Sequence, residues 1–403
     1  MINKPTPYFL FDTQKFTNNI ISFEKSLKSI WSNSIIAYSI KTNYTPGICM
    51  LARELNCYGE AVSTMELELV KKLKFPFGRS IFNGPLKSQD DMKLAIDLGS
   101  IINLDSLQQI YDFLDLPQEL KDNAIIGLRL NVDLGKNKIA SGETIPRFGI
   151  PDNEISIAVQ TLTKRNIQIQ SLHGHASSSD RKPENYSFIS NYLIKTVEQY
   201  KLINIKYLDV GGGFYGSVPD IWGMQDIPSY QDYADAIFKP LLASDLFKKL
   251  KPNVIIEPGM SVVADTMSYI TSVVSKKTIL EKNILGMDGN YFDVRPTLHQ
   301  KPLPFSVVFS KNDSEEKAIL KTYTLTGSTC MERDILLKDV SISENIDIGD
   351  QVIIENLGAY TNVLSPNFIN YACPIYSISE NGSYNTLRNT QSFDEFFTSY
   401  NFN

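Results

Sequence analysis

Four clusters of polar or glycine residues each follow a short apolar run in the sequence. They are Lys41, His173-Gly-His175 with the serines that follow, Asp209-Val-Gly-Gly-Gly213, and Glu257-Pro-Gly259. A lysine removed from bulk water loses stabilisation of its charged form, so its pKa falls and the free amine becomes available for Schiff-base chemistry. Taken singly, each cluster is also typical of an exposed strand end or a tight turn.

Together, the four clusters supply different parts of one chemistry. An imidazole can lie against a flat ring, and serine hydroxyls together with the N–H groups of three glycines can form an anion nest for a phosphate. A carboxylate such as Glu257 can pair with a protonated pyridine nitrogen, the interaction that makes a pyridoxal ring an electron sink. The set therefore predicts a site for pyridoxal 5'-phosphate.

The elements that must position these residues alternate between strands and helices. Between residues 25 and 260 about eight strand-then-helix units follow one another, the number that a closed parallel barrel needs. In such a barrel the active site lies at the carboxyl ends of the strands. We therefore predict an α/β chain with a (β/α)8 TIM barrel over 25–260; a doubly wound open sheet is the alternative.

After about residue 260 the sequence changes to β-branched and aromatic runs separated by turn residues. This pattern is typical of an antiparallel sheet. We expect the short strand at 7–12 to join it, which gives a β-rich domain of residues 1–24 and 261–403. The further strands are expected at 268–274, 306–309, 319–325, 351–355 and 375–379.

Composition excludes several classes of function. The 403 residues are 42 % hydrophobic and 21 % charged, which is usual for soluble globular proteins. The net charge of −6 and the pI near 5.3 argue against binding nucleic acid or an anionic membrane. Four cysteines without CxxC spacing and three histidines favour neither a disulfide framework nor a metal site. Without an apolar signal core or a run of about 18 apolar residues, we expect a cytoplasmic protein.

The chain resembles the fold-type III pyridoxal phosphate decarboxylases, the family of diaminopimelate, ornithine and arginine decarboxylases. Its motifs occur here in the family's order. This resemblance implies pyridoxal 5'-phosphate as cofactor and a barrel followed by a β domain, as in alanine racemases. The matching segments are 37–43, 60–63, 83–88, 128–131, 147–149, 173–175, 208–214, 257–259, 288–289, 295–296, 327–330 with Asp334, and 358–360.

The resemblance also implies roles for matched residues. Lys41 resembles the lysine that forms the internal aldimine, and Cys330 the cysteine that protonates the quinonoid carbon after carbon dioxide leaves. Because that cysteine reaches into the partner subunit's barrel in this family, the resemblance implies a homodimer with shared sites. The implied cofactor contacts are His175 on the ring face, Ser178, Gly211, Gly212, Gly213 and Tyr360 at the phosphate, Glu257 at the ring nitrogen, and Arg129 and Glu60 as supports.

The sequence departs from the family where the distal end of the substrate should bind. Diaminopimelate decarboxylases carry an acidic residue after the cysteine and an arginine after Glu-Pro-Gly, where this chain has Met331 and Met260. His299 replaces the tyrosine expected four residues after Arg295. A thioether can neither accept an ammonium nor pair with a carboxylate, and burying those charges unpaired costs several kcal/mol.

We therefore predict a decarboxylase acting on a less charged or bulkier amino acid, or on an amino-acid-bearing intermediate. A specialised pathway fits this, such as siderophore or antibiotic assembly or an aminocarboxypropyl group of the microcin C kind. The residues expected to contact substrate are Arg295, His299, Met331, Glu332, Asp334 and Met260, with Asp288 and Asp293 as further carboxylates.

Three alternatives stay open. The first is a diaminopimelate, ornithine or lysine decarboxylase of primary metabolism. The second is an amino-acid racemase, which would place an arginine at the ring nitrogen, where this chain has Glu257. The third is an inactive regulatory relative, against which the retention of Lys41 and Cys330 argues.

Overall fold

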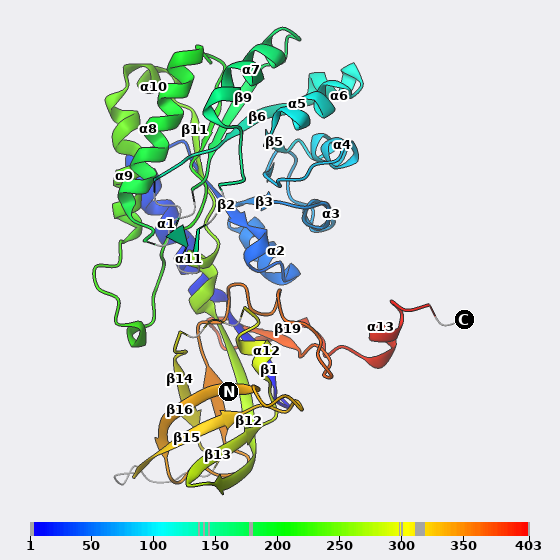
Figure 1. The fold of residues 1–403 in the computed structure, drawn as a ribbon, viewed down its shortest axis with the longest axis vertical. Coiled ribbons are helices and arrows are strands. Elements are labelled where there is room, and N and C mark those ends of the chain that lie inside the picture. Colours follow the sequence, from blue (N-terminus) through cyan, green and yellow to red (C-terminus); the bar gives the residue numbers. More distant parts are fainter. Residues whose placement is uncertain are drawn as a thin grey trace. The chain divides into compact units, whose positions relative to one another are not determined.

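The computed structural model describes residues 4–135, 138–139, 142–143, 146–176, 180–297, 299, 301–310 and 319–401 (Figure 1). The chain forms two compact units. The first, the barrel unit, contains Thr17–Gly216 and Asp226–Val262, and the second, the β-rich unit, contains Met1–Phe16, Ser217–Gln225 and Val263–Asn403. The sequence predicts boundaries after residues 24 and 260, and it did not suggest that 217–225 joins the β-rich unit.

The barrel unit contains a closed barrel of eight parallel strands, as predicted. Each strand pairs with the next along the chain, and β11 closes the ring by pairing Val254 with Ser34 of β2. This closure excludes the open doubly wound sheet. The strands are β2 (Ser34–Ser39), β3 (Tyr58–Ala61), β4 (Ser80–Phe82), β5 (Ile101–Leu104), β6 (Ile125–Leu130), β9 (Ile169–Gly174), β10 (Tyr207–Asp209) and β11 (Asn253–Ile256).

Helices connect these strands, and their starts follow local sequence signals. Ser88, for example, caps α4 by accepting from the Asp91 backbone N–H, while the Asp91 side chain accepts from the Ser88 N–H. The helices are α1 (Thr13–Ile30), α2 (Pro46–Glu54), α3 (Thr64–Lys72), α4 (Gln89–Asp97), α5 (Leu107–Leu114), α6 (Gln118–Asn123), α7 (Asp152–Thr163), α8 (Pro183–Tyr200), α9 (Tyr230–Ala243), α10 (Asp245–Leu250) and α11 (Met260–Val263). Among the described residues, no helix combines the length and apolar character needed to span a membrane.

Apolar side chains from the strands support the end of the barrel where the polar residues gather. Ala37, Ile81 and Ile255 belong to one buried cluster. Ala37 lies two residues before Ser39 on β2, and alternate residues of a strand point to the same face. Ser39 therefore stands above an apolar layer, and the polar residues occupy the next layer toward the strand ends.

The β-rich unit is built around β1 (Tyr8–Asp12), which lies between two strands distant in sequence. It pairs antiparallel with β12 (Met267–Ile279) and parallel with β18 (Ile375–Ile378). The expectation that the N-terminal strand joins this unit is therefore confirmed. The other elements are β13 (Lys282–Met287), α12 (Tyr291–Val294), β14 (Phe305–Val308), β15 (Leu320–Thr326), β16 (Ile335–Ser343), β17 (Gln351–Ile354), β19 (Tyr384–Arg388) and α13 (Phe393–Phe397).

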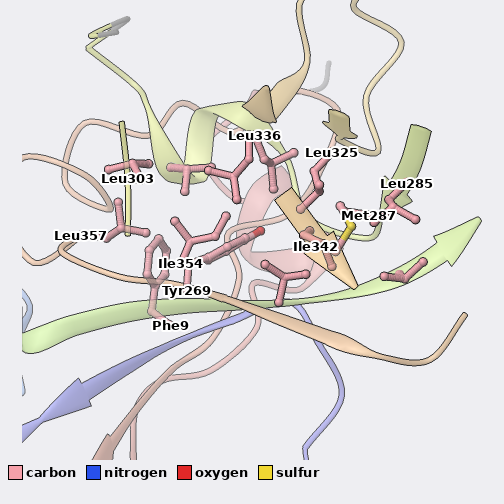
Figure 2. Close-up of a cluster of buried hydrophobic side chains, with 14 of the residues drawn as sticks. Phe9, Tyr269, Leu285, Met287, Leu303, Leu325, Leu336, Ile342, Ile354 and Leu357 are labelled. Atoms are coloured by element: carbon pink, nitrogen blue, oxygen red, sulfur yellow. The ribbon is translucent and has the colours of Figure 1, made fainter. Parts of the chain in front are cut away.

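The core of the β-rich unit is formed by side chains from most of these strands. Phe9, Tyr269 and Ile354 pack together in it (Figure 2), and Leu325 and Leu336 extend the same cluster. The sheet is mostly antiparallel, as predicted, although β1 with β18 and β13 with β15 are parallel pairs.

Candidate active site

Lys41 lies directly after β2, in a single 3-10 turn formed by Ile40–Thr42. Its Nζ donates to Ser39 Oγ at 2.8 Å and to Glu60 Oε2, and the Ser39 hydroxyl donates to the same Glu60 oxygen at 2.6 Å. Glu60 belongs to the neighbouring strand β3 and is 1 % exposed. The ends of two adjacent strands thus place an amine against a buried carboxylate.

Glu60 is ionised in this arrangement. Burial opposes its charge, but the Lys41 ammonium and the hydrogen bonds from Lys41 and Ser39 outweigh that effect and hold the pKa of the carboxyl below its ordinary value. The Lys41 amine therefore has an anion beside it that accepts a hydrogen bond from its Nζ. The sequence predicted only a supporting role for Glu60.

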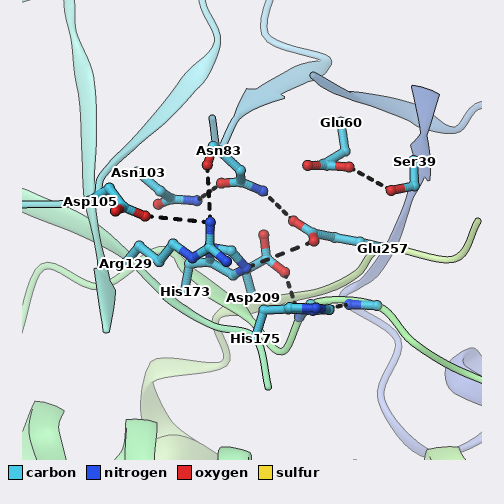
Figure 3. Close-up of polar contacts among 12 residues, drawn as sticks. Ser39, Glu60, Asn83, Asn103, Asp105, Arg129, His173, His175, Asp209 and Glu257 are labelled. Atoms are coloured by element: carbon cyan, nitrogen blue, oxygen red, sulfur yellow. Dashed lines mark hydrogen bonds and ion pairs between the residues drawn. The ribbon is translucent and has the colours of Figure 1, made fainter. Parts of the chain in front are cut away.

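Three buried ionisable groups gather at the carboxyl ends of β9, β10 and β11. His173, Asp209 and Glu257 each offer an atom within 4.8 Å of the others, and His173 Nε2 lies 3.8 Å from Glu257 Oε2 (Figure 3). The sequence predicted Glu257 as a site residue but neither of its neighbours as its partner. Such a triad also has the ligand types of a metal site, which was not predicted from the sequence.

The two carboxyl groups of this triad, Asp209 and Glu257, lie so close together and so deeply buried that ionisation of both is unfavourable. Burial, followed by the neighbouring Asp209 and Glu60 carboxylates, raises the pKa of Glu257 well above its ordinary value. Burial also raises the pKa of Asp209 to about 7. Burial and the nearby cations Arg129 and Lys41 keep the pKa of His173 well below its ordinary range, so this imidazole is neutral. The pair of carboxyls therefore holds a proton at neutral pH.

A chain of polar side chains fixes the orientation of Glu257. Asn83, directly after β4, donates its amide N–H to Glu257 Oε1, and Asn103 of β5 donates to Asn83 Oδ1 at 2.8 Å (Figure 3). Arg129 of β6 donates to the Asn83 carbonyl at 3.3 Å and pairs with Asp105 at 3.4 Å. Arg129, for which the sequence predicts a supporting role, lies in this chain, whereas Asn83, Asn103 and Asp105 were not predicted as site residues. Their positions at strand ends were the available signal.

The glycine turn after β10 is pressed against its neighbours. A Cβ on Gly211 would lie 2.5 Å from His175 Nδ1, and one on Gly212 would lie 2.3 Å from the Glu257 carbonyl oxygen. Gly211 N–H donates to Asp209 Oδ1 at 2.9 Å, and Gly212 N–H donates to His175 Nδ1 at 3.1 Å. Two of the three N–H groups expected to form an anion nest are therefore engaged within the protein, and among the three glycines only Gly213 keeps its donor for an anion.

His175 follows β9 and is half-buried. Burial, with Arg129 and Lys41 nearby, lowers its pKa to about 3, so the ring is neutral and its Nδ1 can accept the Gly212 N–H. A neutral imidazole suits the predicted role of lying against a flat ring. Ser178, predicted at the phosphate, lies outside the described residues.

The remaining predicted residues belong to the β-rich unit. Cys330 is exposed on the loop between β15 and β16, and Met331 beside it is 42 % exposed. Asp334 is buried and anchors this loop: its Oδ1 accepts from Tyr291 N–H at 2.7 Å and its Oδ2 from Thr329 N–H at 2.8 Å. The carboxylate predicted to bind substrate is thus occupied by the protein's own backbone.

Arg295, another predicted substrate contact, has partners within the β-rich unit. Arg295 is 9 % exposed and donates to the carbonyls of His299 at 3.0 Å and Lys301 at 2.7 Å. Burial and nearby cations lower the pKa of half-buried His299. Tyr360, half-buried in a turn, has a left-handed backbone with φ of 54°. Met260 belongs to the barrel unit, at the start of α11.

The barrel residues fit the cofactor expected from the sequence. Lys41 supplies the amine, and Asp209 Oδ2 and His173 Nδ1 are buried without a hydrogen-bond partner among the described residues. Buried polar atoms of this kind call for a ligand with matching polar groups. A Cβ on Gly211 or Gly212 would clash with His175 or Glu257, so only glycine lets this turn pack closely against these two residues.

Comparison with known proteins agrees with this geometry. The family description "Pyridoxal-dependent decarboxylase, pyridoxal binding domain" matches residues 14–264. A probable chloroplastic diaminopimelate decarboxylase of Oryza sativa subsp. japonica is 25 % identical, with 97 % of this chain and 79 % of the relative covered. The diaminopimelate decarboxylase of Aquifex aeolicus is also 25 % identical, with 96 % and 90 % covered.

Solved structures share the fold. Diaminopimelate decarboxylase from Helicobacter pylori, complexed with L-lysine, superimposes with a TM-score of 0.81 at 21 % identity, covering 98 % of this chain and 97 % of that one. A lysine/ornithine decarboxylase from Vibrio vulnificus, complexed with cadaverine, gives a TM-score of 0.74 at 20 % identity, covering 93 % and 95 %.

Proposed function

Because the chain belongs to the family of pyridoxal-dependent decarboxylases, and is thus a pyridoxal 5'-phosphate-dependent amino-acid decarboxylase, we propose that its substrate is an amino acid other than free meso-diaminopimelate. The distal end of that substrate is less charged or bulkier, as in an amino acid joined to a larger molecule. The observation that carries this proposal is that three of the four candidate carboxylates in the β-rich unit already accept hydrogen bonds from the protein itself.

The chemistry itself depends on proton positions in the barrel unit. When bound, pyridoxal 5'-phosphate supplies an electron sink for the electron pair that remains when carbon dioxide leaves. Glu257 and Asp209 hold a proton between them, and Asn83 and Asn103 keep the Glu257 carboxyl in one orientation. A basic ring nitrogen facing Glu257 would receive that proton, and the resulting cation would pair with the Glu257 carboxylate.

Lys41 and Cys330 carry the remaining proton transfers. Lys41 must lose a proton to act as an amine, and its ammonium donates to Glu60, which pairs with its charge and orients Nζ. Cys330 would protonate the substrate carbon, and we propose that it does so in a homodimer, where its exposed loop meets the partner's barrel. The exposure of Cys330 and Met331 supports an assembly that covers them.

Four carboxylates of the β-rich unit were candidates for binding a distal ammonium, and three are already engaged. Asp288 accepts from Thr271 Oγ1 and Ser272 N–H, and Asp293 accepts from Tyr269 and Asn290. Asp334 accepts from two backbone N–H groups. Of the four, this leaves Glu332, two residues after the cysteine and exposed. A buried ammonium without a paired carboxylate is unfavourable.

The two methionines extend this argument to both charges of a diamino dicarboxylic acid. Met331 cannot accept from an ammonium, and Met260 cannot pair with a carboxylate. Arg295, the other candidate for a distal carboxylate, is buried and donates to two carbonyls of its own unit. A siderophore or antibiotic intermediate, or an aminocarboxypropyl group of the microcin C kind, needs neither contact.

A second candidate is a diaminopimelate, lysine or ornithine decarboxylase of primary metabolism. The names of the relatives favour it, since several of them are diaminopimelate decarboxylases with about a quarter of their residues identical to this chain. Exposed Glu332 would then bind the distal ammonium.

Measured carbon dioxide release from a panel of substrates separates the two. The panel contains meso-diaminopimelate, L-lysine, L-ornithine and amino acids with amide-linked or ester-linked bulky ends. We expect low kcat/KM for the diamino acids and an increase of roughly 10- to 100-fold in Met331→Asp, because one charge-assisted hydrogen bond contributes about 1.5–3 kcal/mol. Met65→Asp, at an exposed methionine of α3, is the matched control. Turnover of diaminopimelate far above all bulkier amino acids would contradict the proposal.

A further inference from the structure

Arg181 lies on the loop between β9 and α8 and contacts the segments that follow the next two strands of the barrel. Its guanidinium carbon is 5.1 Å from the centre of the Tyr215 ring, two residues after the glycine turn. Its NH1 is 3.6 Å from the sulfur of Met260, which follows Glu257-Pro-Gly. One cation from the β9 loop thus reaches the loops behind β10 and β11.

Two buried tyrosines fix this loop beside the glycine turn. The Tyr233 hydroxyl donates to the Arg181 carbonyl at 2.8 Å and accepts from Tyr215 N–H at 3.1 Å, so it joins the two backbones. Tyr186 donates to the Gly212 carbonyl at 3.1 Å. Burial raises the pKa of Tyr233 to about 12, which keeps its hydroxyl protonated as this bridge requires. The placement of Arg181 is therefore set by the same contacts that hold the glycine turn.

The glycine turn alone is poorly equipped to hold a phosphate. Gly211 and Gly212 donate their N–H groups to Asp209 and His175. A phosphate monoester carries close to two negative charges at neutral pH, and a desolvated anion needs a cation as well as hydrogen bonds.

Other cations at the strand ends contact groups outside the glycine turn. Lys41 donates to Glu60 and Ser39, Arg129 pairs with Asp105 and donates to the Asn83 carbonyl, and Lys87 donates to the Gly84 carbonyl and to Gln109. Arg181, in contrast, touches the residue that extends the glycine turn. A guanidinium also presents a planar fork of donors that matches phosphate oxygens.

We propose that Arg181 binds the phosphate of the cofactor and supplies the charge that the glycine turn lacks. This inference rests on the pyridoxal phosphate assignment. Because NH1 of Arg181 touches the Met260 sulfur, a guanidinium introduced at position 260 would reach the same region. A double variant that removes the guanidinium at position 181 and adds one at position 260 can therefore test whether a cation is needed in this region.

The test compares binding of pyridoxal 5'-phosphate with binding of pyridoxal, which lacks the phosphate, to the apoenzyme by absorbance titration. Arg181→Met should raise the dissociation constant for the phosphorylated form roughly 10- to 100-fold and leave that for pyridoxal within about twofold, because only the charge-assisted contact is lost. Arg181→Lys should keep most of the affinity. Adding Met260→Arg to Arg181→Met should restore it.

Lys182→Met, at the exposed neighbouring cation, is the matched control and should change neither constant. Equal losses for both ligands in Arg181→Met, or no loss for either, would overturn the inference. If Arg181→Met does not fold, weakened phosphate-dependent binding in Arg181→Gln and its recovery by Met260→Arg decide the matter. A wild-type protein that binds neither ligand would instead contradict the cofactor assignment.

Discussion

Asn83 donates its side-chain amide to Glu257 Oε1, joining the ends of β4 and β11 across the mouth of the barrel. Both residues are buried, Asn83 at 2 % and Glu257 at 5 % exposure. Since Asn103 occupies the oxygen of the same amide, the N–H end must face Glu257. The carboxyl is therefore oriented before any ligand arrives.

From this contact we predict that Glu257→Gln lowers kcat by about 10²- to 10⁴-fold, the usual effect of removing a positioned acid–base group. Asn83→Ala should lower kcat less, about tenfold, because the carboxyl remains but loses its fixed orientation. Steady-state carbon dioxide release measures both. Glu355→Gln, at an exposed glutamate, serves as the control. A kcat equal to that of the wild type in Glu257→Gln would show that this carboxyl takes no part in the reaction.

The Glu257–Asp209 pair predicts a pH dependence of apoenzyme stability. Burial raises the pKa of Asp209 from 3.8 to about 7, and that of Glu257 is raised as well, so the folded protein binds more protons than the unfolded chain in this range. The pair's contribution is complete below pH about 4 and is lost as pH rises toward 7, by at most about 1.4 kcal/mol per proton and pH unit.

Asp209→Asn should reduce this loss, because one of the two competing charges is gone while Asn Oδ1 can still accept from Gly211. Urea unfolding of both apoproteins between pH 4 and pH 8 measures the difference. A parallel pH dependence in the two proteins would show that the carboxyls do not share a proton.

A dimer with shared sites predicts complementation between two inactive variants. Lys41→Ala and Cys330→Ala alter different units of the chain. If each site combines Lys41 of one subunit with Cys330 of the other, co-refolding equal amounts should restore about a quarter of wild-type activity through mixed dimers. The control mixes Lys41→Ala with Glu257→Gln, both in the barrel unit, and should stay inactive. No recovery in the first mixture would exclude shared sites.

Asp334 anchors the Cys330 loop, and its two oxygens both accept from backbone N–H groups. Asp334→Asn would turn an NH2 group toward one of those donors, which costs about 1–3 kcal/mol. We expect lower kcat with unchanged cofactor affinity, because the loop and not the barrel is disturbed. Asp339→Asn, at an exposed aspartate of β16, is the control. A parallel fall in cofactor affinity would contradict this assignment.

The sequence predicted the barrel well because its strands are apolar runs and its helices are amphipathic. It missed α6, whose residues Gln118–Asn123 are polar and bury no side chain, and three strands of the β-rich unit, β13, β16 and β19. In β13, Lys282 and Asn283 interrupt the apolar pattern, and tertiary pairing with β12 and β15 makes this segment a strand.

The sequence predicted those site residues that have a local signal at the end of a single strand, but not the contacts between strands. Lys41, Glu257 and the glycine turn carry local signals in their residue types. The contacts among Asn83, Asp209 and Glu257 come from three strands far apart in sequence, so only closure of the barrel brings them together. Arg181 gave no signal, because its importance comes from Met260 and Tyr215.

The place of β1 in its sheet has a consequence for biosynthesis. Its two neighbours, β12 and β18, begin at Met267 and Ile375, so β1 is synthesised long before either strand and must wait for both before it is paired on both edges. Meanwhile the barrel strands, which follow one another in sequence, can pair in the order of synthesis. Until then β1 exposes apolar side chains and unpaired backbone groups, which favour aggregation, so we expect chaperones to bind this segment during translation.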